Sequence, residues 1–178
     1  MIIIKLFEKI SFFVVLVLLF SIFSGCTESN KDTGDNFVFT DVNGETKHLI
    51  DYRGKVVILD MWATWCGPCQ LMMLELSKAY ENYSRNDLEI ISLDVYLNEN
   101  VQIIQSYRTW FFQNYGVELN WTFGKDDGNI WKKYRLSDPG GIPTLYIFDK
   151  NGKVYYSNEG YESYSLFSSK IDELLNKK

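Results

Sequence analysis

The chain has 178 residues, of which 46% are hydrophobic and 23% charged, a balance typical of one globular domain with a short appendage. Its formal net charge of −5 argues against a nucleic-acid partner, which would require a basic patch. Three cysteines are too few for a disulfide-stapled scaffold, and a structural zinc site would need every cysteine and the one histidine of the chain, so we expect no metal and no bound cofactor.

The N-terminus is typical of an export signal. Lys5 and Lys9 precede an apolar run, residues 10–23, that is shorter than the roughly 20 residues of a transmembrane helix. Ser24-Gly25-Cys26 follows directly and resembles the processing site of bacterial lipoproteins, which implies cleavage before Cys26 and lipidation of its thiol. The alternative is an uncleaved signal anchor. Both interpretations hold the domain at the extracytoplasmic face of the cell membrane.

We therefore divide the chain into a signal peptide of the lipoprotein type at residues 1–25, a polar flexible tether at residues 26–35 and a folded domain at residues 36–178. The folded domain begins with a predicted β-hairpin around Val42-Asn43-Gly44. Residues 56–59 form a continuous apolar run, as expected of a strand that is buried on both faces.

Helices and strands alternate in the rest of the chain. Apolar spacing predicts helices over Met72–Tyr83, over Ile104–Tyr115 with Asn98 or Asn100 as cap, and over Phe167–Leu175. The intervening strands are predicted at residues 88–95, at Trp121–Phe123, and at residues 144–148 and 154–156 around a turn. A short helix is predicted over Ile130–Tyr134, with Asp126 or Asp127 as its cap. This alternation predicts an α/β layered domain.

The segment Trp65-Cys66-Gly67-Pro68-Cys69 lies between a predicted buried strand and a predicted amphipathic helix. A thiolate is the nucleophile in disulfide exchange, and the free N–H groups of a helix N-terminus lower the pKa of a cysteine placed there. Pro68 suits the first turn of a helix, and the two-residue spacing lets Cys69 attack a mixed disulfide on Cys66. The alternatives are half of a metal site or two inert cysteines, but the sequence holds no second ligand pair.

Residues 57–70 (VILDMWATWCGPCQ) resemble the active-site segment of thioredoxins, as does the Asp149–Gly152 turn after an Ile-Pro-Thr segment. The first hairpin and the segment Trp121–Arg135 resemble the membrane-anchored TlpA/ResA-like branch of that superfamily. The resemblance covers roughly residues 36–178. It implies a thioredoxin-like three-layer α/β fold, with a central mixed β-sheet flanked by helices, an N-terminal β-hairpin and a TlpA-type insertion.

The resemblance also implies roles in a thiol–disulfide oxidoreductase. Cys66 matches the attacking cysteine, Cys69 the resolving cysteine, Pro143 the cis-proline beside the active site and Asp60 the buried acid. The lysine that pairs with this acid in thioredoxins is absent, and Ser92 takes its place. The alternatives are that Asp60 caps the end of a strand and that Pro143 is an ordinary trans proline in a turn.

Substrate binding is implied for Trp65, Gly67, Pro68 and Ile142. The implied partners are disulfide-containing exported proteins, of which apocytochrome c is the family's best-known client, and a membrane electron-donor protein that recharges the dithiol. The Gly-Pro pair between the cysteines favours a reductant, because thioredoxin, with a potential of about −270 mV, is far more reducing than the oxidant DsbA at about −120 mV.

Three other functions are less compatible with the sequence. A thiol oxidant or isomerase remains an alternative, although Gly67-Pro68 and Ile142 count against it. A Sco-like copper carrier uses C-x-x-x-C with a distant histidine, whereas the spacing here is one residue shorter and His48 precedes the motif. A peroxiredoxin needs a P-x-x-x-T-x-x-C environment, which the residues before Cys66 do not supply.

Overall fold

The computed structural model describes residues 34–176, so the predictions for the export signal, the first part of the tether and Cys26 lie outside the described residues. The elements in chain order are β1 (Val38–Asp41), β2 (Thr46–His48), the 3-10 helix η2 (Leu49–Tyr52), β3 (Val56–Trp62), α2 (Gly67–Asn82), β4 (Leu88–Asp94), α3 (Val101–Tyr115), β5 (Thr122–Lys125), α4 (Asn129–Tyr134), β6 (Thr144–Phe148), β7 (Val154–Glu159) and α5 (Tyr164–Asn176).

One mixed sheet contains all seven of these strands, in the order β2-β1-β5-β4-β3-β6-β7. Strand β3 pairs in parallel with β4 and antiparallel with β6. Strand β5 continues the sheet in parallel beyond β4, and the β1–β2 hairpin joins it antiparallel. The mixed sheet and the N-terminal hairpin confirm the fold that the sequence predicts.

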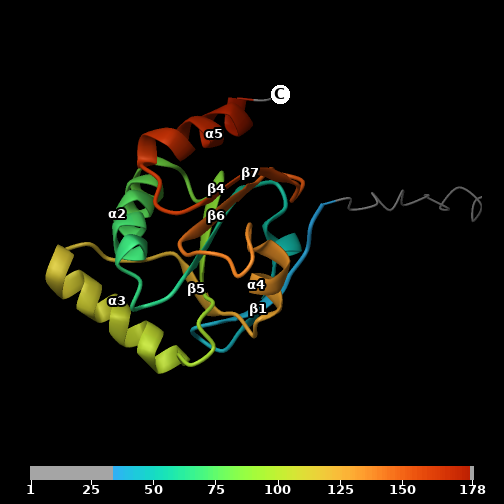
Figure 1. The fold of residues 1–178 in the computed structure, drawn as a ribbon. Coiled ribbons are helices and arrows are strands. Elements are labelled where there is room, and N and C mark those ends of the chain that lie inside the picture. The colour runs from blue at the N-terminus through green and yellow to red at the C-terminus, as the bar shows by residue number, and fades with distance from the viewer. Residues whose placement is uncertain (1–33, 177–178) are drawn as a thin grey trace, which may run out of the picture. The chain divides into compact units, whose positions relative to one another are not determined.

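The side chains of β3 alternate between two buried apolar clusters, one on each face of the sheet. Val56, Ile58 and Trp62 belong to a cluster that includes side chains of α2, α3 and α5. The intervening residues Val57 and Leu59 belong to a cluster with side chains of β1, η2 and α4. Figure 1 shows α2, α3 and α5 apart from α4, across the strands of the sheet. The domain therefore has three layers, and β3 is buried on both sides as its apolar run predicts.

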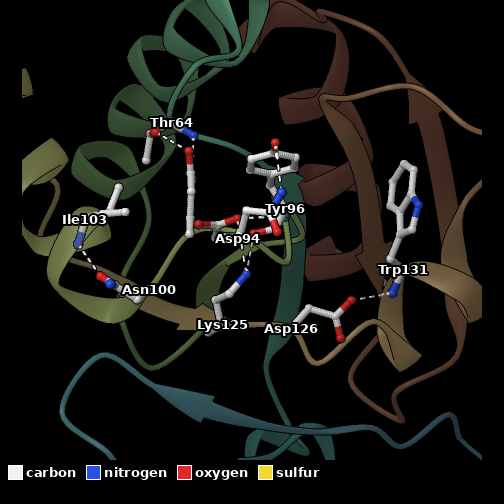
Figure 2. Close-up of polar contacts among 10 residues, drawn as sticks. Thr64, Asp94, Tyr96, Asn100, Ile103, Lys125, Asp126 and Trp131 are labelled. Carbon is white, nitrogen blue, oxygen red and sulfur yellow. Dashed lines mark hydrogen bonds and ion pairs between the residues drawn. The ribbon is translucent and has the colours of Figure 1, made fainter.

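The structure confirms Asn100 as a helix cap, whereas the N-cap residue of α4 is Gly128 and the two predicted aspartates lie just before it (Figure 2). Asn100 Oδ1 accepts the backbone N–H of Ile103 at 3.0 Å and caps α3. The Asp126 carboxylate accepts the N–H groups of Ile130 and Trp131 at 3.0 and 2.8 Å, at the start of α4. Such bonds satisfy donors that have no partner inside the helix.

Predicted boundaries shift at several elements, of which the first hairpin and β5 are two. The second strand of the first hairpin ends at His48, because Leu49 turns into η2 and is fully buried there. The short strand predicted at residues 121–123 is β5, which begins one residue later and extends to Lys125. Within residues 34–176, no helix combines the length and the apolar character needed to span a lipid bilayer.

Candidate active site

Cys66 and Cys69 form a disulfide at the start of α2, with an S–S distance of 2.06 Å and Cα atoms 5.2 Å apart. Cys66 is the N-cap residue of the helix, and the backbone N–H of Cys69 donates a hydrogen bond to Cys66 Sγ at 3.2 Å. Pro68 lies in the first turn, where its missing N–H leaves no bond unmade. After reduction, the same helix end favours a thiolate on Cys66.

Both cysteines are largely covered in the disulfide form. Cys66 exposes 4% of its surface and Cys69 none, so the cysteine that matches the nucleophile is only slightly more exposed than its partner. The residues around them lie at the surface: Trp65 is 61% exposed, and Gly67 and Pro68 are also exposed. A polypeptide that approaches the disulfide therefore meets these three residues before it reaches sulfur.

The loop before β6 brings Pro143 to the disulfide from a distant part of the chain. The Ile142–Pro143 peptide bond is cis, as the resemblance implies and unlike the trans alternative. The carbonyl oxygen of Ile142 lies 3.7 Å from Cys66 Sγ, which accounts for part of the cover over that atom. The Pro143 carbonyl accepts the N–H of Gly160 at 2.8 Å, which ties the loop to the end of β7.

Asp60 lies within β3 and is fully buried, on the same face of the sheet as Ile58 and Trp62. It has paired neighbours in both β4 and β6, so it does not cap the end of a strand. Burial raises the pKa of its carboxyl from 3.8 to about 7, although a hydrogen bond from Ser92 opposes the rise.

A chain of neutral donors replaces the lysine that is missing beside Asp60. Trp121 Nε1 donates to Ser92 Oγ at 2.9 Å, and Ser92 Oγ donates to Asp60 Oδ2 at 2.9 Å. The other oxygen, Asp60 Oδ1, accepts no hydrogen bond from the described residues. Neutral donors compensate a carboxylate less than an ammonium group does, so Asp60 remains easy to protonate near neutral pH.

Two contacts in this region have no signal in the sequence. The spacing of Trp121 predicts a strand, but nothing in it indicates a hydrogen bond to Ser92, 29 residues away. Glu99 accepts hydrogen bonds from Thr64 in the active-site loop, 35 residues away, and no motif connects the two. Among residues 34–176, no three histidine, cysteine or acidic side chains converge closely enough to hold a metal ion.

Comparisons with known proteins agree with this geometry. The family model described as AhpC/TSA family matches residues 31–157. The chain is 32% identical over 142 residues to the thiol-disulfide oxidoreductase ResA of Bacillus thuringiensis subsp. konkukian, covering 80% of this chain and 74% of that protein.

Solved structures give the same fold. A thioredoxin-like protein from Aeropyrum pernix superposes with a TM-score of 0.61 at 26% identity, over 78% of this chain and 89% of that one. The exposed lipoprotein thioredoxin Etrx1 of Streptococcus pneumoniae superposes with a TM-score of 0.62 at 23% identity, over 79% of this chain and 100% of that one.

The three-layer fold and the disulfide at the N-terminus of α2 define a thioredoxin-like thiol–disulfide oxidoreductase. The resemblance to ResA-like proteins that the sequence carries is thereby confirmed. The chain belongs to the AhpC/TSA family.

We expect Asp60→Asn to stabilise the oxidised protein at alkaline pH and to change its stability little near pH 4. The folded-state pKa of about 7 lies above the unfolded value of 3.8, so the contribution of Asp60 is most favourable below the unfolded value and is lost as the pH rises through about 7. A shift of about three pKa units corresponds to at most about 4 kcal/mol at high pH. Urea unfolding at about pH 4 and about pH 8.5 measures the difference. An equal effect at both pH values would contradict the assignment.

Proposed function

We propose that the protein reduces disulfides in exported proteins, with Cys66 as the nucleophile and Cys69 as the resolving thiol. The observation that carries the proposal is the arrangement of the pair at the N-terminus of α2, where Cys66 receives an N–H donor and Cys69 is fully buried. The Gly67-Pro68 pair supports the reducing direction, because thioredoxin carries it and has a potential of about −270 mV.

The reaction begins with the reduced dithiol. The Cys66 thiolate attacks one sulfur of the client disulfide, which forms a mixed disulfide and releases the other client sulfur as a thiolate. Cys69 then loses its proton and attacks Cys66 Sγ, so that the Cys66–Cys69 disulfide forms and the second client sulfur leaves as a thiolate. Two electrons pass from the protein to the client, and a membrane electron donor supplies two electrons to restore the dithiol.

Asp60 is the proposed acceptor of the Cys69 proton. Its carboxyl lies on the face of the sheet that packs against the apolar cluster containing Cys69. Its pKa of about 7 suits a group that must release and accept a proton near neutral pH. The oxygen Oδ1, which has no donor among the described residues, is the one available to take the proton.

Client binding is assigned to the surface around the disulfide. Trp65, Gly67 and Pro68 are exposed beside Cys66, and the Ile142 carbonyl oxygen lies 3.7 Å from Cys66 Sγ. Backbone groups beside Pro143 would pair with an extended client segment, as in recognition by strand addition. This mode of binding uses hydrogen bonds to the backbone of the client and depends little on its side chains. It therefore suits a protein that acts on more than one exported disulfide.

The place of action is the extracytoplasmic face of the membrane. Lys5, Lys9 and the apolar run before Cys26 support export, and the site at Cys26 supports a lipid anchor. Apocytochrome c is the proposed client, because its two thiols must be reduced before they take up haem.

The direction of electron flow is tested by the redox equilibrium of the soluble domain. We expect the domain to reduce insulin disulfides with dithiothreitol as donor, and the Cys66/Cys69 potential to lie well below about −180 mV, the disulfide-isomerase value. Equilibration with a glutathione or dithiothreitol series measures it. A potential above that value would favour an isomerase or oxidant.

The division of labour between the cysteines is tested by trapping. We expect Cys69→Ser to accumulate clients as covalent adducts on non-reducing gels, because the first attack proceeds and the second cannot. Cys66→Ser serves as the matched control and should trap almost no client. If the control traps clients and Cys69→Ser does not, the two roles are reversed. A copper carrier would trap clients with neither variant and would lose metal with both.

Anchoring is tested by the intact mass of the protein extracted from membranes. We expect the loss of residues 1–25 and added acyl mass on Cys26, because cleavage of this type of signal peptide leaves a lipidated cysteine at the new N-terminus. Cys26→Ala is the control and should remain uncleaved. A full-length, unmodified chain in the membrane would indicate a signal anchor instead.

A further inference from the structure

Two carboxyl groups lie against each other beside the active-site loop, in a place that the proposed reaction does not use. Asp94 ends β4 and is fully buried, and Glu99 precedes α3 and is 9% exposed. The fold brings both side chains to the start of the active-site loop, because Asp94 pairs with Trp62 in the register and Glu99 Oε2 accepts the N–H of Thr64, two residues after Trp62. The Glu99 carboxyl is thereby a neighbour that raises the pKa of Asp94. Two ionised carboxylates in contact repel strongly where water is scarce, so one of the pair carries a proton.

Glu99 holds the active-site loop through Thr64. The backbone N–H of Thr64 donates to Glu99 Oε2 at 3.1 Å, and the Thr64 hydroxyl donates to Glu99 Oε1. Thr64 lies two residues before Cys66, in a turn closed by a bond from the Cys66 N–H to the Ala63 carbonyl at 3.1 Å. Both Glu99 oxygens accept bonds from Thr64, so Asp94 is the member of the pair that is left to carry the proton.

The surroundings of Asp94 leave one oxygen for that proton. Asp94 Oδ1 accepts the Tyr96 N–H at 2.8 Å and lies 3.7 Å from Lys125 Nζ. Asp94 Oδ2 is buried and receives no hydrogen bond from a donor among the described residues. Figure 2 shows Thr64, Asp94, Tyr96 and Lys125 gathered here, while the Asp126 carboxylate turns away toward α4.

The balance of these neighbours places the titration of Asp94 near neutral pH. Burial, above all, and the adjacent Glu99 raise the pKa of Asp94 to about 7, against the lowering effects of the Tyr96 N–H and of Lys125. The same segment also contacts the loop through aromatic rings, since Tyr96 packs edge-on against Trp65 with ring centroids 5.5 Å apart. Thr64 and Trp65, the two residues before Cys66, are thus both held from one side.

We propose that Asp94 and Glu99 share one proton and are positioning residues for disulfide exchange, because the protonated pair fixes Thr64 and with it the loop that carries Cys66. Loss of the proton at alkaline pH leaves two negative charges in contact, which draws Glu99 away from Thr64 and loosens the loop. The kinetic consequence rests on the proposed role of Cys66, whereas the shared proton and the loop are measurable without any client.

The proton is measured on the oxidised protein, because the disulfide removes both thiol titrations. In an Asp60→Asn background, which removes the other carboxyl with a strongly raised pKa, we expect the Thr64 amide resonance to titrate with a midpoint of about 7 in amide proton–nitrogen correlation spectra. Adding Asp94→Asn supplies an amide N–H that still donates to Glu99 but cannot ionise. We expect the titration of Thr64 to vanish in this double variant.

The effect on the reaction is measured as the rate at which dithiothreitol reduces the disulfide. The pH dependence that comes from ionisation of dithiothreitol and of Asp60 is common to both proteins. It therefore divides out when the wild-type rate is divided by the Asp94→Asn rate. We expect this ratio to fall by about threefold or more between about pH 6 and about pH 8.5 as the loop loosens. Glu81→Gln, which alters an exposed carboxylate of α2, is the matched control and should give a constant ratio.

A second pair of variants covers the case in which Asp94→Asn fails to fold. Thr64→Val removes the hydroxyl donor to Glu99 and should slow reduction, whereas Thr64→Ser keeps both donors and should restore the rate. Any one of four results would overturn the proposal. Two concern the spectra: the Thr64 amide resonance does not titrate, or its titration persists after Asp94→Asn. Two concern the rates of reduction: the ratio of the wild-type rate to the Asp94→Asn rate stays constant with pH, or the two Thr64 variants react at equal rates. If the expected results hold but insulin is not reduced, the proposed function fails and the carboxyl pair stands.

Discussion

The burial of β3 on both faces is the constraint on which the active site depends. Its residues are covered on one side by α2, α3 and α5 and on the other by η2 and α4, so the strand cannot shift without exposing apolar surface on one face or the other. The active-site loop follows β3 directly and leads into α2. The position of Cys66 is therefore set by the most buried strand of the domain.

The same burial explains why two acids in this region have raised pKa values. Asp60 and Asp94 lie on the neighbouring strands β3 and β4, with Asp94 opposite Trp62 in the register. Both are fully removed from solvent, and the compensation available to each is small: a neutral hydroxyl for Asp60, and a peptide N–H with a lysine 3.7 Å away for Asp94. Both carboxyls have a pKa of about 7, so they change charge in the pH range where thiols also exchange protons.

The disulfide lies between a fixed interior and an open exterior. Behind it are buried groups that bind or hold protons, and in front are the exposed Trp65, Gly67 and Pro68. Disulfide exchange needs both, because the attacking thiolate must meet a large and variable partner while the second thiol stays shielded until the mixed disulfide forms. The exposed Trp65 and the fully buried Cys69 meet these two needs, access for the client and shielding of the second thiol.

The sequence by itself determined the order of elements and the redox pair, and the buried acid at Asp60 was implied by the resemblance to thioredoxins. The order of elements and the redox pair depend on local signals: the apolar run before Cys66, the helical spacing after it and the Gly-Pro pair at a helix start. Only the tertiary structure decided which distant groups meet these residues. Trp121 reaches Ser92, and Glu99 reaches Thr64, through strand pairing and loop packing that bring together residues 29 and 35 positions apart. The low exposure of Cys66 likewise depends in part on the Ile142 carbonyl, which lies 76 positions away in the chain. Hydrophobic periodicity predicts which face of a helix or strand is buried, but it does not predict which polar side chain from elsewhere in the chain is buried against that face.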